Sequence, residues 1–188
     1  MICINVCIVH QIDLGGAVTG GIDSVIRGIA KSAPADIEVR VVGLTTAPAQ
    51  RPVGQWTEVQ LGRRRIKFLP VGVAGTAMLR KGIPLSVRMA WGVLRYRSQI
   101  LAQCDVLEFH RLEAGLPLWG AWQGKNTVVH QNIAALTNKN SVIGWRHFPS
   151  LYFALESRFL HAMDNVFCVR SDATEAYRQR FLCIADRF

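Results

Sequence analysis

Apolar residues fall in short runs along the whole chain, separated by polar and glycine-rich segments. The first run, residues 2–9, is rich in β-branched residues and broken only by Asn5, which predicts a strand buried on both faces of a parallel sheet. Over residues 22–30 apolar positions recur every three or four residues, which predicts an amphipathic helix that Pro34 ends. A second buried strand is predicted over residues 39–44. Strand, glycine loop, helix and strand form the opening of a Rossmann-like unit.

The same alternation continues to the end of the chain. Further strands are predicted over residues 56–61, 66–71, 105–110, 127–130 and 166–169, and helices over residues 84–103, 115–122, 148–162 and 173–181. This order predicts an α/β fold with a mainly parallel sheet and helices on both of its faces. Because the sequence contains no repeat or evident linker, residues 1–188 are expected to form a single Rossmann-like domain.

Composition narrows the class of protein. Half of the 188 residues are hydrophobic and 19% are charged, which supports a sizeable core and excludes a disordered chain. No stretch reaches the roughly 18 apolar residues of a membrane span, and no secretory signal opens the chain. The five cysteines are odd in number and include no CxxC pair, which favours reduced thiols in a cytoplasmic protein over a zinc site.

The chain carries 22 basic and 13 acidic residues, a net charge of +9. Such a charge predicts an anionic partner: nucleic acid, an acidic membrane surface or a phosphorylated small molecule. Nucleic acid is disfavoured, because the sequence holds no RNP signature, zinc finger or similar recognition motif.

Four glycines, Gly15, Gly16, Gly20 and Gly21, lie between the first predicted strand and the helix that follows it. Glycine lets the backbone approach a ligand closely, and a helix N-terminus offers unpaired N–H groups to a phosphate. The spacing matches neither GxGxxG nor the lysine-containing P-loop. Contact with a phosphate or sugar and a turn without a ligand are both compatible with this pattern.

Histidines end three of the predicted strands, at His10, His110 and His130. The carboxyl ends of parallel strands border the ligand crevice of open α/β sheets, where an imidazole can bind a hydroxyl or phosphate or transfer a proton. A purely structural histidine is the alternative at each position. Gln131 and Asn132 follow His130 and could hydrogen-bond a hydroxyl-rich ligand. No nucleophile elbow lies nearby, so a hydrolytic triad is not supported.

The predicted helix over residues 84–103 combines basic and apolar side chains. Arg88 and Arg95 are seven residues apart and share a face, with Trp91 between them. This combination favours contact with an anionic bilayer surface or a lipid-phosphate acceptor, and a solvated helix face is the alternative.

Five segments, taken in order, carry a resemblance to a known family. They are INVCIVH, GGIDSVIRGIAKSAPADIEVRVVGL, CDVLEFHR, NTVVHQN and ESRFLHAMDNVFCVRSDATEAYRQRF. Together they resemble the N-terminal half of family-4-type retaining glycosyltransferases of the GT-B fold. In that family two Rossmann-like domains face each other across a cleft. The N-terminal domain mainly binds the acceptor, and the C-terminal domain holds most of the nucleotide-sugar donor.

The resemblance implies a role for several residues. Gly20 and Gly21 would lie against the donor diphosphate or an acceptor phosphate. His130 would point at the transferred sugar and help to position it, as the expected catalytic residue. His110 and Ser171 would line the cleft less directly. No metal or cofactor is implied, because the nucleotide sugar is a co-substrate.

The family's donor-binding glutamate pair has no counterpart in this sequence, so the chain is expected to lack the C-terminal donor-binding domain. The implied reaction is sugar transfer with retention to a sugar or lipid-linked acceptor, in the cytoplasm or at the inner face of a membrane. A stand-alone module that binds a nucleotide or phosphosugar without catalysis is the alternative.

Overall fold

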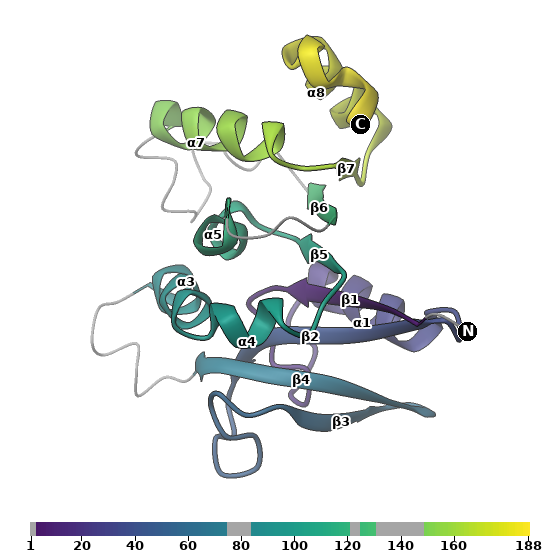
Figure 1. The fold of residues 1–188 in the computed structure, drawn as a ribbon, viewed down its shortest axis with the longest axis vertical. Helices are drawn as coiled ribbons and strands as arrows, with labels where there is room; N and C mark the ends of the chain where they lie inside the picture. Colours follow the sequence, from purple (N-terminus) through teal and green to yellow (C-terminus); the bar gives the residue numbers. More distant parts are fainter. Residues whose placement is uncertain (1–2, 75–83, 121–124, 131–148) are drawn as a thin grey trace.

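One sheet of seven strands organises the computed structural model, which describes residues 3–74, 84–120, 125–130 and 149–188 (Figure 1). The strands are β1 (Ile4–Val9), β2 (Ile37–Thr45), β3 (Thr57–Leu61), β4 (Arg64–Val73), β5 (Val106–Phe109), β6 (Lys125–His130) and β7 (Asn165–Cys168). They lie in the order β3-β4-β2-β1-β5-β6-β7, and only β3 runs antiparallel to its neighbour. The predicted α/β class with a mainly parallel sheet is confirmed.

Helices cover both faces of this sheet (Figure 1). The α-helices are α1 (Gly21–Ser32), α3 (Leu85–Arg95), α4 (Arg97–Leu101), α5 (Leu112–Gly115), α7 (Pro149–His161) and α8 (Ser171–Arg180), and two 3-10 helices are η1 (Leu116–Leu118) and η3 (Leu182–Arg187). Helix α1 packs on one face and the others on the opposite face. Within the described part of the chain, no helix has both the length and the apolar content needed to cross a bilayer.

The packing of β1 between two hydrophobic cores explains its apolar residues. Successive strand residues point to opposite faces, so Ile8 packs with Ile26 of α1, while Cys7 and Val9 pack in the core on the other face, which includes Met89 of α3. All three β1 residues are fully buried. Burial on both faces is what a central parallel strand requires, as its sequence predicts.

Two predicted helices differ from the structure. The helix expected over residues 84–103 is interrupted at Tyr96, whose φ of −102° and ψ of 16° depart from helical values. The Tyr96 ring lies directly against Gly54, a contact with a distant turn that local periodicity does not reveal. The short helix expected over residues 115–122 begins earlier, at Leu112, and continues as η1. Pro117 lacks the N–H that another α-helical turn would need.

The strand order reverses direction beside β1. From β1 the chain builds β2 and β4 on one side, then returns to build β5, β6 and β7 on the other. The carboxyl ends of β1 and β5 therefore form a topological switch point, the usual ligand crevice of open α/β sheets. In this pairing Val9 lies opposite Phe109, so the residues that follow them emerge at the same edge.

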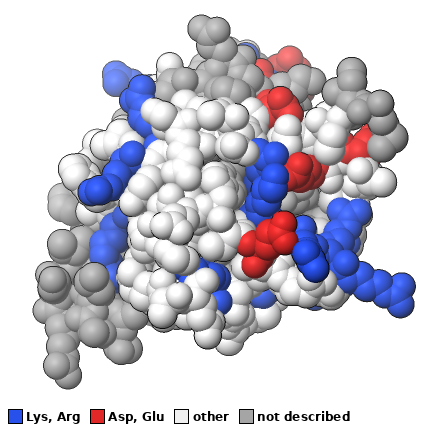
Figure 2. Space-filling model, turned by 60° about the horizontal axis from the view of Figure 1, so that its bottom comes forward, with Lys and Arg blue, Asp and Glu red and all other residues white. Residues whose placement is uncertain are grey.

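Charged side chains are unevenly distributed over the surface. The face seen in Figure 2 has a broad uncharged area, with Lys and Arg on both sides of it and Asp and Glu gathered on one side.

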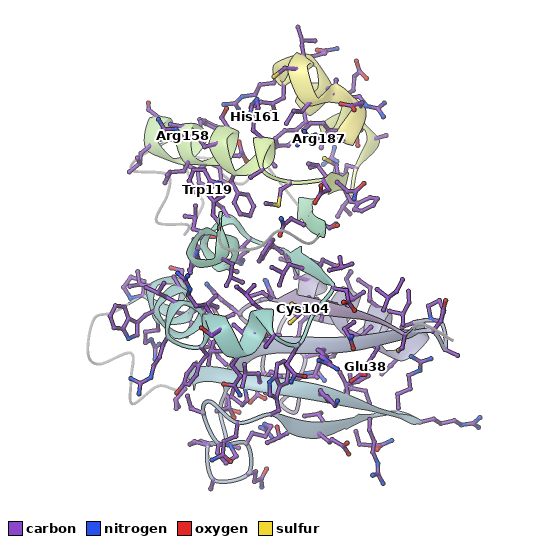
Figure 3. All side chains as sticks on the ribbon, viewed as in Figure 1. Glu38, Cys104, Trp119, Arg158, His161 and Arg187 are labelled. Carbon is purple, nitrogen blue, oxygen red and sulfur yellow. The ribbon has the colours of Figure 1, made fainter. Side chains whose placement is uncertain are left out.

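The last helices are tied together by one arginine. Arg187 of η3 donates from Nη1 to the carbonyls of His161, at 2.9 Å, and Met163, at 2.7 Å, at the end of α7 (Figure 3). Tyr177, Phe181 and Phe188 stack beside this link with ring centroids 5.5–6.4 Å apart. These contacts hold the segment after α8 against α7.

Candidate functional site

Two histidines meet at the switch point. His10 directly follows β1 and His110 directly follows β5, and their ring centroids are 5.7 Å apart in an edge-to-face arrangement. Both residues are buried, at 6% and 4% exposure. The structure therefore joins two side chains that lie one hundred positions apart in the sequence, at the edge where this fold class binds ligands.

Glu108 holds the second histidine in place. Nε2 of His110 lies 2.7 Å from Oε1 of Glu108, two residues earlier in β5. Because side chains two apart in a strand share a face, this pairing follows from the local backbone. A carboxylate on one ring nitrogen fixes the orientation of the imidazole.

His10 has an unsatisfied polar atom. Its Nδ1 is buried and has no hydrogen-bond partner among the residues that the structure describes. Burial, followed by the charges of His110 and Arg111, lowers the pKa of His10 from 6.5 to about 3. The ring is therefore neutral at physiological pH. A buried nitrogen without a partner costs about 1–3 kcal/mol, so the site holds a hydrogen-bonding position that a ligand could satisfy.

This lowered pKa predicts a measurable loss of stability in acid. Between pH 6.5 and pH 3 the unfolded state binds a proton at His10 that the folded state does not, so the free energy of unfolding falls as the pH falls. We expect His10 to account for a loss of about 2 kcal/mol between pH 7 and pH 5. Urea unfolding of the wild type and of His10→Gln at both pH values measures this difference. Parallel pH profiles for the two proteins would contradict it.

The glycine loop after β1 is held by Asp13. Its Oδ2 accepts hydrogen bonds from the Thr46 backbone, at 2.7 Å, from the Thr46 hydroxyl, at 2.6 Å, and from Arg51, at 3.1 Å. Its Oδ1 accepts one from the Gly15 N–H at 3.2 Å. Burial raises the pKa of Asp13, but these hydrogen bonds from Thr46 and Arg51 outweigh it and hold that pKa below its ordinary value.

A second clamp comes from helix α1. The buried Arg27 donates to Oδ1 of Asp23 at 2.9 Å and to the carbonyls of Asp13, at 2.8 Å, and Gly16, at 2.9 Å. Asp23 in turn accepts from the Thr19 N–H at 2.9 Å. One arginine thus joins the start of the loop, its middle and the first turn of the helix, and this fixes the path of the loop to Gly20.

Gly20 and Gly21 have no structural reason to be glycine. Among the described residues, a Cβ built on either would meet nothing within 4 Å, and neither residue has the left-handed φ that favours glycine. Gly20 is extended, with φ 177° and ψ −179°, and caps α1 without a side-chain hydrogen bond. The N-terminus of the twelve-residue helix α1 therefore faces open space. The N–H groups there carry the positive end of the helix dipole.

A cavity of about 400 Å³ opens beside the same loop, on the side of β3. Leu14, Gly15, Arg27, residues 50–51 and residues 58–61 line it. Nε of Arg51 is buried, and no described residue forms a hydrogen bond with it. The glycine loop therefore borders a polar recess in addition to the edge at the switch point.

The other predicted site residues are placed only in part. His130 is the last residue of β6, opposite Cys168 of β7, so its backbone lies at the same sheet edge as His110. Its side chain, and the whole of Gln131 and Asn132, lie outside the described residues. Ser171 begins α8 after β7, is exposed, and also lies at this edge.

The predicted basic face of α3 is divided by the structure. Trp91 and Arg95 are exposed. Arg88 instead points back to the sheet and donates from Nη1 to the Val73 carbonyl at 3.1 Å. Two of the three residues thus remain available to a partner.

Sequence reasoning placed His10 at a strand end beside the expected crevice, but it did not assign Glu108, Asp13 or Arg27 to the site. Alternation within β5 could have linked Glu108 to His110. A spacing of four residues on α1 could have linked Asp23 to Arg27. No local signal pairs His10 with His110, because their contact depends on the strand order.

Comparison with known proteins supports the fold. No protein-family model matches the chain, and no curated protein matches it. A sucrose-phosphate synthase from Thermosynechococcus elongatus has a similar structure, with a TM-score of 0.59 and 13% sequence identity. The match covers 95% of this chain and 45% of the synthase chain. At 13% identity this similarity shows the fold alone. The chain has a Rossmann-like α/β fold, similar to the fold of the matched 45% of the synthase chain.

Proposed function

We propose that this chain is the acceptor-side half of a retaining glycosyltransferase that transfers a sugar from a nucleotide sugar to an acceptor hydroxyl. The observation that carries the proposal is the switch-point edge, where the His10–His110 pair and the open Gly20–Gly21 turn both follow the central strands. The fold similarity to part of a sucrose-phosphate synthase supports it.

The glycine turn supplies an anion site in this proposal. Phosphate oxygens would accept hydrogen bonds from the free N–H groups at the start of α1, and the missing side chains of Gly20 and Gly21 let them come close. Asp13 and Arg27 hold the turn in shape without occupying this space. The phosphate belongs to the donor diphosphate or to a phosphorylated acceptor.

Histidines would contact the sugar. His10 is neutral and has an unpaired Nδ1, so it can form a hydrogen bond with a sugar hydroxyl without a charge. His110, oriented by Glu108, would line the same crevice. We further propose that His130 positions the transferred sugar and that Gln131, Asn132 and Ser171 bind the substrate.

In the reaction, the acceptor oxygen forms a bond to the anomeric carbon, and the bond from that carbon to the phosphate oxygen breaks. The hydroxyl proton passes to the departing nucleoside diphosphate. Most donor contacts would come from a second domain facing this one, consistent with a chain that covers 45% of the synthase it is similar to.

The test replaces the two open glycines. For Gly20→Ala/Gly21→Ala we expect the free energy of unfolding to stay within about 0.5 kcal/mol, because the added methyl groups meet no protein atom. Binding of inorganic pyrophosphate, measured by isothermal titration calorimetry, should weaken by about tenfold or more because the methyl groups fill the anion site.

Gly28→Ala is the matched control, since it adds a methyl group on the same helix, also in open space, away from the N-terminus. Equal pyrophosphate affinity in the double variant and the wild type would contradict the anion site. In the protein with its donor-binding half, the double variant should also lose transfer of labelled sugar. Pyrophosphate binding with no transfer by that complete protein would favour the non-catalytic binding module instead.

A further inference from the structure

The outer face of α3 exposes an apolar ridge. Val87, Trp91 and Leu94 are 54%, 68% and 44% exposed. Their spacing of four and three residues places them on one side of a helix with 3.6 residues per turn. Arg95, also exposed, follows Leu94 and lies next to Trp91 on the helix surface. We call Val87, Trp91, Leu94 and Arg95 the α3 ridge.

The apolar residues of this ridge are not needed to attach α3 to the sheet. Met89 and Val93 are fully buried on the opposite side of the helix. A Cβ on Gly92 would lie 2.2 Å from the Val71 carbonyl oxygen, so the helix backbone already rests directly on β4. Since the inner face is complete, the exposed apolar side chains are available to something outside the described residues.

In the sequence, the segment that contains the ridge carries positive charge only. From Val59 to Cys104 the sequence contains nine Lys and Arg residues and no Asp or Glu, so this stretch holds the entire net charge of +9. Some of these groups have partners: Lys67 pairs with Glu38 at 3.0 Å, and Arg88 contacts the Val73 carbonyl. Arg95 and Arg97, at the end of α3 and the start of α4, are exposed.

We propose that the α3 ridge binds the surface of an anionic lipid bilayer. Tryptophan, leucine and valine would enter the boundary between head groups and acyl chains, while arginines contact lipid phosphates. Three side chains expose much less than the roughly 800 Å² that each partner buries in a stable protein dimer. Nucleic acid would contact the arginines but leave the apolar side chains in water. The inference does not depend on the proposed sugar transfer.

The test is co-sedimentation of the 188-residue chain with vesicles. We expect binding to phosphatidylcholine mixed with phosphatidylglycerol, weaker binding at higher salt, and little binding to phosphatidylcholine alone. Trp91→Gln should weaken binding to the mixed vesicles by about tenfold, through lost apolar burial. Arg95→Gln should weaken it by about fivefold.

The matched control is Arg65→Gln, which removes another exposed arginine, one that lies on β4 beside Glu58, at 3.5 Å. It should bind mixed vesicles nearly as well as the wild type. Circular dichroism checks that Trp91→Gln keeps its fold, as expected for a residue that is 68% exposed. Equal binding to both kinds of vesicle, unchanged binding by Trp91→Gln, or a dimer abolished by that substitution without vesicle binding would overturn the proposal.

Discussion

Gly92→Ala is expected to destabilise the protein by about 3 kcal/mol, because the new methyl group has no space. Its Cβ would lie 2.2 Å from the Val71 carbonyl oxygen and 2.9 Å from the Val71 carbonyl carbon, which are backbone atoms of strand β4. Helix α3 would have to move away from β4, and Met89 and Val93 would then lose part of their packing. Urea unfolding followed by circular dichroism measures the change in the free energy of unfolding.

For Gly28→Ala, in helix α1, we expect the opposite effect on stability. Gly28 lies within α1 and is exposed, and a Cβ added there would meet no atom within 4 Å. Alanine there should stabilise the protein by about 0.5–1 kcal/mol, because it reduces the entropy lost when the helix forms. If both substitutions changed stability by the same amount, the close approach of α3 to β4 would be disproved.

Arg27→Met is expected to cost about 3 kcal/mol as well, for an electrostatic reason. The Arg27 side chain is 10% exposed and its partner Asp23 is 6% exposed, so the substitution leaves a buried carboxylate without its cation. It also leaves the carbonyls of Asp13 and Gly16 without their donor. Because these carbonyls belong to the glycine loop, pyrophosphate binding should weaken together with stability.

Two variants separate this effect from a general loss of positive charge. Arg65→Met removes an arginine that is 75% exposed, and it should change the free energy of unfolding by less than about 0.5 kcal/mol. The double variant Asp23→Asn/Arg27→Met should be more stable than Arg27→Met alone, since the unpaired charge is gone. A double variant that is less stable than either single variant would argue against the buried pair as the cause.

Some site residues were foreseeable and others were not. The strand-ending positions of His110 and His130 follow from local alternation, and the structure has both at the carboxyl edge of the sheet. The clamp formed by Asp13 and Arg27 joins the loop after β1 to the following helix over eleven to fourteen residues. Such a contact depends on how the loop folds back, which hydrophobic periodicity does not describe.

Helix α3 also combines features that the sequence predicts with features that it does not. Periodicity predicts an amphipathic helix after Pro84, because it reports which side chains can share a face. The helix is interrupted at Tyr96, whose ring lies against Gly54, and Arg88 turns inward and donates to the Val73 carbonyl. Val73 lies in β4 and Gly54 lies in the turn before β3. The sequence of α3 by itself therefore does not predict either contact.

Four properties follow from the sequence without coordinates: the α/β class, the order of strands and helices along the chain, the glycine-rich turn after the first strand and the surplus of positive charge. These properties depend on residues close together in the chain, where burial and backbone preference act locally. Which strands are neighbours is known only from the folded molecule. The same holds for the contact of His10 with His110, the packing of Gly92 on Val71 and the exposure of Trp91. Strand pairing is settled by the packing of both sheet faces at once, so it is a property of the whole chain.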